Sequence, residues 1–404
     1  MKKLVVLLIS LGLTLTGCSS SLQKNGQTTQ QSTQTKDNSI VPKYSISDQY
    51  YKTILPFKAG AARGLVLQGL NTRLDVDEYE SGLMRIAQNT FNTKDYYFQE
   101  GQYLDSTVTQ QLLLRKRTDS QQKDAEAKAA PTSGKSSSIP NIGLNPVYDP
   151  NAAGTTDQKN TKSPIYLANI LEHDFMTKDS SGNAKLGGIV IGLAMNSVYY
   201  TNLPDNEGGY PREYEIPLQD AITQGKQMAQ SVLDTLYKKS TDAKNVPITI
   251  AIYRQQTKSS LVPGNYVTYV NLDKGQTRVD GWKDVNEKYY LFPSTQASND
   301  VREDATRLLN FKTSISDYFP NNFTAVVGKG FYKDNQLKSL DLDIPVQFNG
   351  KAEVIGFTQY VASLVMDQFP NYIKVQVNIH SVDKPEAIIV RDVNQDKPTV
   401  QVFD

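Results

Sequence analysis

The feature that most constrains the fold is an internal repeat, because one order of hydrophobic patterns occurs twice along the chain. Alternating apolar residues predict strands, and apolar residues three and four positions apart predict helices. In the second copy the predicted strands lie at 340–346, 373–379 and 387–390, and the predicted helix lies at 352–369. In the first copy the strands lie at 188–195, 246–252 and 266–270, and the helix lies at 218–237. Repetition over this length favours two related structural units.

The match extends upstream in both copies. A predicted strand precedes the first core strand across a polar turn, at 165–170 and again at 324–331. A further helix is predicted before that strand, at 108–116 and 301–311. We therefore predict an α+β fold with two tandem related domains, each a mainly antiparallel sheet with packed helices. We expect the first domain to span residues 46–260 and the second to span residues 261–404.

The N-terminus has the pattern of an export signal. Two lysines follow Met1, and an apolar run from Leu4 to about Leu15 is too short to span a bilayer permanently. The run ends in a lipoprotein processing box, which consists of Leu15, Thr16, Gly17 and Cys18. We predict a lipoprotein signal peptide over residues 1–17 and a diacylglycerol on Cys18. The alternative is a plain secretory signal with a chance cysteine.

The cysteine content agrees with lipidation. Cys18 is the only cysteine in 404 residues, so an exported form has no internal disulfide. Two acyl chains are enough for stable anchoring. We expect a protein attached by lipid to the extracytoplasmic face of the cell membrane, with the membrane and the lipoprotein-processing enzymes as its partners.

Two polar segments interrupt the hydrophobic patterns. Residues 18–45 are mostly Ser, Gln, Thr, Asn and Lys, which predicts a disordered tether. Residues of about 117–162 form a second polar stretch, which we interpret as a disordered insertion in the first domain. Within it, residues 142–148 are apolar enough to be pinned to the surface.

Charge and motifs argue against several classes of function. The 43 basic and 42 acidic residues leave no basic field for nucleic acid. His173 and His380 lack a second histidine at metal-ligand spacing, and no Gly-x-Ser-x-Gly turn is present. The acidic run from Asp75 to Glu78 is typical of a helix start, and Asp341 and Asp343 are expected to face solvent from one strand. We predict no enzyme, no cofactor and no metal, with a cell-wall or peptide hydrolase as the alternative.

One loop is a candidate binding element. Residues 56–64 combine glycine with the basic residues Lys58 and Arg63 at the entry to the first domain. Such a loop could clamp an anion. The alternative is a tight turn that carries a surface arginine.

The chain resembles the CamS family of sex pheromone precursor lipoproteins of Gram-positive bacteria. The resemblance rests on the box at 15–18, on Arg63-Gly64-Leu65, on the run from Tyr97 to Leu104 and on Gly143-Leu144-Asn145-Pro146. The two tandem repeats are also similar to the family's organisation.

The resemblance implies a double role. The end of the signal peptide would be released as a hydrophobic peptide pheromone that is sensed in plasmid conjugation. The corresponding stretch consists of Ser10, Leu11, Gly12, Leu13, Thr14, Leu15, Thr16 and Gly17. The resemblance implies no function for the mature domains. For these we expect a surface binding module with a peptide, glycan or protein ligand in the groove between the repeats.

Overall fold

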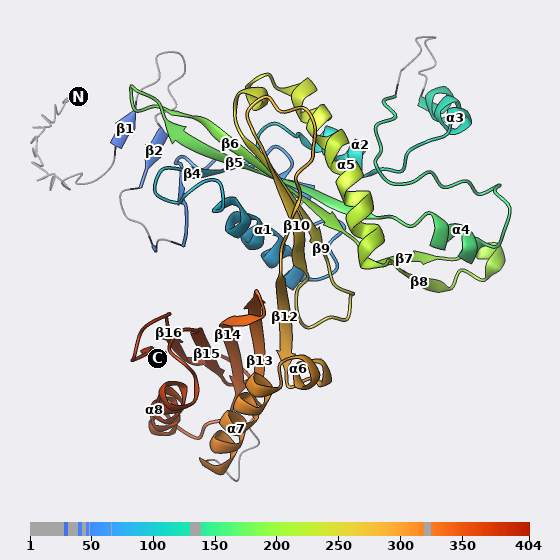
Figure 1. The fold of residues 1–404 in the computed structure, drawn as a ribbon. Helices are drawn as coiled ribbons and strands as arrows, with labels where there is room; N and C mark the ends of the chain where they lie inside the picture. Colours follow the sequence, from blue (N-terminus) through green and yellow to red (C-terminus); the bar gives the residue numbers. More distant parts are fainter. Residues whose placement is uncertain are drawn as a thin grey trace, which may run out of the picture.

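The computed structural model describes residues 28–30, 39–42, 46–47, 49–65, 67–129, 139–318 and 325–404. This part of the chain forms one sheet of seven strands and one of six, with helices packed on both (Figure 1). Two smaller two-stranded sheets accompany them, and the β7 (Val198–Asn202) and β8 (Pro211–Glu215) hairpin is one of these. No helix within these ranges is both long and apolar enough to cross a bilayer.

The seven-stranded sheet belongs to the first repeat. In spatial order its strands are β11 (Lys283–Asp284), β10 (Asn265–Leu272), β9 (Ile248–Arg254), β6 (Ala184–Met195), β5 (Leu167–Lys178), β4 (Tyr97–Glu100) and β3 (Lys52–Thr53). The β6–β9 and β3–β4 pairs are parallel and the others antiparallel. Parallel neighbours need a long crossover, and helix α5 (Leu218–Lys239) supplies it between β6 and β9.

Helices cover both faces of this sheet. Helix α5 and helix α2 (Ser106–Leu113) pack on one face, and helix α1 (Arg73–Ala87) packs on the other (Figure 1). Strands β6 and β9 are therefore buried on both sides, which explains their continuous apolar sequences. Gly188 allows this packing, because a Cβ at that position would lie 2.1 Å from the Phe91 ring.

The six-stranded sheet belongs to the second repeat. Its strands run in chain order: β12 (Glu287–Phe292), β13 (Val327–Lys333), β14 (Gln336–Pro345), β15 (Lys374–His380), β16 (Pro385–Arg391) and β17 (Thr399–Val402). Helix α8 (Lys351–Gln368) crosses between the parallel strands β14 and β15. Helices α6 (Thr295–Asp300) and α7 (Arg302–Tyr318) precede β13. Burial alternates along β13, β14 and β15, as expected for a sheet with one covered face.

The two sheets repeat one topology. The order β4, α2, β5, β6, α5, β9, β10 in the first matches β12, α7, β13, β14, α8, β15, β16 in the second. In both, the parallel pair brackets the long crossover helix and sits in the same place within the sheet. The predicted α+β fold with mainly antiparallel sheets is confirmed, and the shared strand order agrees with the predicted repeat.

The change from one sheet to the other lies later than the division expected after residue 260. Strand β10 pairs with β9 along its length, and β11 pairs with β10. Both strands thus complete the first sheet, and the second begins with β12 at Glu287. The hairpin between β9 and β10 is the physical reason, because its ladder cannot be divided between two sheets.

The polar segments contain more regular structure than predicted. In the expected insertion, helices α3 (Asp119–Ala129) and α4 (Thr156–Lys162) form, so the prediction of disorder is wrong for these residues. Helix α4 begins with a capping box at Thr155, and capping of this kind stabilises short helices. Within the expected tether, β1 (Thr28–Gln30) pairs with β2 (Ser39–Val41), and the rest lies mostly outside the described residues. The amide of Leu144 donates to the carbonyl of Leu112 at 2.9 Å, which pins this segment as expected.

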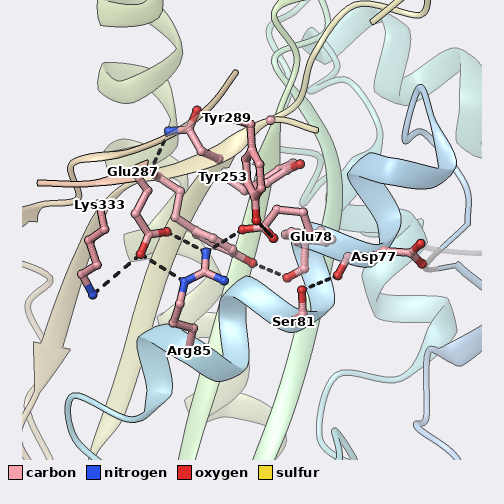
Figure 2. A network of polar contacts seen from close by, with 12 residues as sticks. Asp77, Glu78, Ser81, Arg85, Tyr253, Glu287, Tyr289 and Lys333 are labelled. Carbon is pink, nitrogen blue, oxygen red and sulfur yellow. Dashed lines mark hydrogen bonds and ion pairs between the residues drawn. The ribbon is translucent and has the colours of Figure 1, made fainter. Parts of the chain in front are cut away.

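A buried ionic network joins the two repeats (Figure 2). The Arg85 guanidinium on α1 lies 2.5 Å from Glu78 of the same helix and 2.7 Å from Glu287 at the start of β12. The Tyr289 hydroxyl donates to Glu78 at 2.6 Å, and Lys333 Nζ lies 3.8 Å from Glu287. Burial raises the pKa of Glu78. Helix α1 of the first repeat and strands β12 and β13 of the second therefore meet in one ionic network.

Candidate functional site

A cavity of about 330 Å³ lies in the first repeat, at the edge of the sheet where β4 ends. Helix α1, strand β5 and the loop around a short 3-10 helix at Arg63–Leu65 enclose it. The size is at the lower end of the range for ligand pockets, which is about 300–1,000 Å³. The lining combines an apolar floor with a charged rim, so a small amphipathic molecule would fit it.

Helix α1 contributes one side of the cavity. The lining residues Arg73, Val76, Glu80 and Met84 are three or four positions apart, so they lie on one face of the helix. The helix starts as the acidic run predicts, because the Thr72 side chain caps it by accepting from the Asp75 amide at 3.0 Å.

Asp75 itself is structural rather than part of the cavity. It is fully buried and accepts from the Tyr253 hydroxyl at 2.8 Å and from the Gly264 amide at 2.9 Å. These bonds tie the start of α1 to the connection between β9 and β10. They fix the helix that carries Glu80 against the sheet.

Strand β5 supplies the floor with a buried histidine. His173 is 3% exposed and stands edge-on to the Phe98 ring, with ring centroids 4.9 Å apart. Its Nδ1 atom finds no hydrogen-bond partner among the residues that the structure describes. Burial lowers the pKa of His173 to about 3, so its imidazole is neutral at physiological pH. An unpartnered buried polar atom costs free energy, so His173 is kept in the wall of the cavity at the expense of stability.

Two buried carboxyl groups flank His173 along β5. Glu172 accepts from the amides of Gln102, Tyr103 and Leu104 at 3.2, 3.0 and 2.6 Å. Burial, and then the charge of Glu172, hold the pKa of Asp174 well above its usual range. Burial also raises the pKa of Glu172, but the three amide donors lower it, so Asp174 is the member of the pair that holds a proton more strongly. The turn after β4 is thus wrapped around the Glu172 carboxyl group.

The predicted binding loop closes the rim of the cavity. The Gly60 amide donates to Glu100 Oε2 at 2.5 Å, and Arg63 Nε lies 3.7 Å from Glu100 Oε1. Arg63 lines the cavity and also rests on the Phe57 ring at 5.1 Å. Lys58 is exposed and acts electrostatically on Asp174. The cations of this loop therefore already face carboxylates of the protein, and binding of an external anion stays a prediction.

The other predicted site residues lie elsewhere. Cys18, the processing box at 15–17 and the candidate pheromone at 10–17 fall outside the described residues. His380 belongs to the second sheet, where its Nε2 lies 2.9 Å from Asp343 Oδ2, and Asp341 and Asp343 share the uncovered face as expected. In the described ranges no three His, Cys, Asp or Glu side chains are grouped to hold a metal ion.

Sequence reasoning missed the carboxylates Glu80, Glu100 and Glu172. Part of their signal is visible in retrospect, since the polar triplet from Glu172 to Asp174 lies between the apolar pairs 170–171 and 175–176 of one strand. Two stretches that carried the family resemblance also meet here. Arg63–Leu65 forms the rim, and the run from Tyr97 to Leu104 forms β4 and the turn around Glu172. The described lining residues include no serine, threonine or cysteine nucleophile.

Comparisons with known proteins agree on one family. The family model described as CamS sex pheromone cAM373 precursor matches residues 57–397. The chain is similar to a sex pheromone precursor of Lactobacillus salivarius subsp. salivarius UCC118, with a TM-score of 0.75 and 29% identity over 89% of this chain and 98% of that one. It is also similar to the C-terminal domain of the sex pheromone staph-cAM373 precursor from Staphylococcus aureus, with a TM-score of 0.67 and 30% identity over 84% of this chain and 100% of that one. No curated protein matches the chain.

The family model covers both repeats, the cavity and the network between the sheets. The chain therefore belongs to the CamS family of sex pheromone cAM373 precursors.

Proposed function

We propose that the chain is a lipoprotein of the extracytoplasmic face of the cell membrane, and that its folded part binds a small ligand in the cavity beside helix α1. The observation that carries the binding role is a cavity with an apolar floor and a charged rim, in whose wall the buried His173 leaves Nδ1 without a hydrogen-bond partner among the described residues. The volume suits one or two residues of a peptide, or a single sugar of a glycan. Lipid on Cys18 is supported by the processing box at residues 15–18.

A thermal-shift experiment tests the binding role. Full-length protein in detergent micelles is heated with the low-molecular-weight fraction of a cell-envelope extract. A ligand at 100 times its Kd stabilises the folded state by about 2.7 kcal/mol, so the melting temperature rises. In Ala62→Trp the indole fills the cavity, and the shift is lost. Ala127→Trp, on the exposed surface of α3, is the matched control and keeps the shift.

Two results would reject this role. One is the absence of any shift in wild-type protein with every envelope fraction. The other is an equal shift in wild-type protein and Ala62→Trp, because a ligand that ignores the filled cavity binds somewhere else.

We also propose that the discarded signal peptide is the source of a pheromone, within Ser10 to Gly17. The family is described as sex pheromone precursors, and this stretch is uncharged and rich in leucine. Culture supernatant of cells that express the chain should induce plasmid transfer in carrier cells. Leu13→Lys puts a charge in the middle of the peptide and should abolish that response, while an unchanged response rejects this stretch as the source.

A further inference from the structure

The cavity carries an imbalance of charge at its rim. Three carboxylates line it, Glu80, Glu100 and Glu172, against the two guanidinium groups of Arg63 and Arg73. Glu172 is satisfied by three backbone amides, and Glu100 by the Gly60 amide and Arg63. Glu80 remains, half-buried, and within the described residues no hydrogen bond reaches its carboxylate.

The two arginines do not neutralise Glu80. Arg73 is paired with Asp77 at 3.0 Å, and 73% of its side chain is exposed. Arg63 is paired with Glu100, and 58% of its side chain is exposed. Burial raises the pKa of Glu80 and the charges of Glu100 and Asp77 raise it further, while the charges of Arg73 and Arg63 lower it by less. Glu80 is therefore a half-buried carboxylate whose two nearby cations are each paired with another carboxylate.

The floor agrees with a cationic ligand that has an apolar body. Phe98, Leu171 and Val76 are buried side chains that would contact a hydrocarbon group. His173 is neutral, so it does not repel a cation. The imidazole is independent of the acidic rim, because it is 3% exposed, belongs to the lining of the cavity and leaves its Nδ1 atom without a hydrogen-bond partner among the described residues.

We infer that the cavity selects a primary ammonium group on a short apolar body, such as the free N-terminus of a peptide that begins with an aliphatic residue. Glu80 holds the ammonium group, the floor holds the side chain, and the neutral ring of His173 lies in the wall beside them. This inference rests on the proposed binding function and names the class of its ligand. A half-buried acid whose neighbouring cations are paired elsewhere favours an ammonium ligand over a carboxylate.

Three leucine derivatives of one shape and different charge test the selectivity. Leucinamide is cationic, N-acetylleucinamide is neutral, and N-acetylleucine is anionic. Titration calorimetry on the full-length chain in detergent micelles should show leucinamide binding at least about tenfold more tightly than the other two. Glu80→Gln should remove that preference. Glu303→Gln, which makes the same change at an exposed glutamate of α7, is the control and should keep it.

Ring signals of the two histidines report where the probe binds. The chain contains two histidines, so carbon-13 labelling of histidine gives two resonances, and a His380→Asn variant assigns them. Leucinamide should shift the His173 signal and leave that of His380 in place. The inference is overturned if a neutral or anionic probe binds equally well or if none of the three binds. If a neutral or anionic probe binds equally well and also shifts the His173 signal, the cavity is still a binding site. In that case only the proposed selectivity for an ammonium group is rejected.

Discussion

At the residue scale, the two histidines of this chain experience opposite surroundings. Burial lowers the pKa of His173, whereas the hydrogen bond that the His380 ring donates to Asp343 raises the pKa of His380. The protonated His380–Asp343 pair contributes stability below its unfolded pKa of about 6.5, and that contribution is lost as the pH rises through the folded pKa. Because this pair is largely exposed, its contribution is small. His173 is the histidine whose titration affects folding strongly.

Acidification should therefore destabilise the protein through His173. Its pKa is about 3 in the folded state and about 6.5 in the unfolded state, so between these values the unfolded chain binds one proton more. The resulting loss is about 1.4 kcal/mol for each pH unit below 6.5. The comparison of urea unfolding of wild-type protein with His173→Gln isolates this contribution, since the variant lacks the titrating ring. The stability difference between the two proteins should shrink as the pH falls. A difference that is constant between pH 6.5 and 4.5 would show that His173 titrates normally.

At the element scale, the turn after β4 depends mainly on one carboxylate. The amides of residues 102–104 all donate to Glu172, which is 8% exposed, and that of Gln102 also donates to Asp174 at 3.0 Å. This arrangement holds the rim of the cavity in place. It also explains why a short strand followed by an irregular turn is well defined at the edge of the sheet.

Glu172→Gln should loosen that turn. A glutamine side chain has one acceptor oxygen and an NH2 group, which would face the three backbone N–H donors of residues 102–104. The charge-assisted hydrogen bonds, worth about 1.5–3 kcal/mol each, are therefore weakened. We expect a loss of about 2–4 kcal/mol in the free energy of unfolding. Amide hydrogen exchange at residues 102–104 should rise with it. Glu213→Gln on exposed β8 is the control. Unchanged exchange at these amides in Glu172→Gln would contradict the assignment of Glu172 as their anchor.

Much of the element order is predictable from the sequence, because the strands and helices of both repeats carry strong periodic signals. The expected helix over 218–237 forms as Leu218–Lys239, and the expected strand over 373–379 forms as Lys374–His380. Helix α3 buries no residue, so its sequence lacks the apolar periodicity from which a helix can be predicted. The cavity was not predictable in the same way. Its carboxylates come from α1, β4 and β5, and only the tertiary fold brings them together.

At the scale of the whole molecule, the two repeats are related in topology but differ in what covers them. Helix α1 closes the second face of the first sheet, and the same helix carries Glu78 and Arg85 to the second repeat. The residues of α1 that line the cavity and those that form the ionic network thus lie on one rigid helix. Placement of the second repeat is therefore coupled to the helix that lines the cavity.

Loss of Arg85 should uncouple the repeats. Arg85→Met leaves the buried Glu78 without a cation and Glu287 with only Lys333 at 3.8 Å, and breaking a buried ion pair in this way costs about 3–5 kcal/mol. Arg73→Met on the same helix removes an exposed pair with Asp77, which is worth about 0–1 kcal/mol. Guanidinium unfolding measures both. Equal stability of the two variants would show that the network does not hold the repeats together.

The central claim for the whole molecule is that it is a lipid-anchored surface protein that discards its signal peptide. Mass spectrometry of the cell-associated protein and of the culture medium tests this most directly. We predict a mature chain that begins at Cys18 with a diacylglycerol on its sulfur, and a fragment within Ser10 to Gly17 in the medium. A cell-associated chain that begins at Met1, or one with an unmodified Cys18, would contradict the claim.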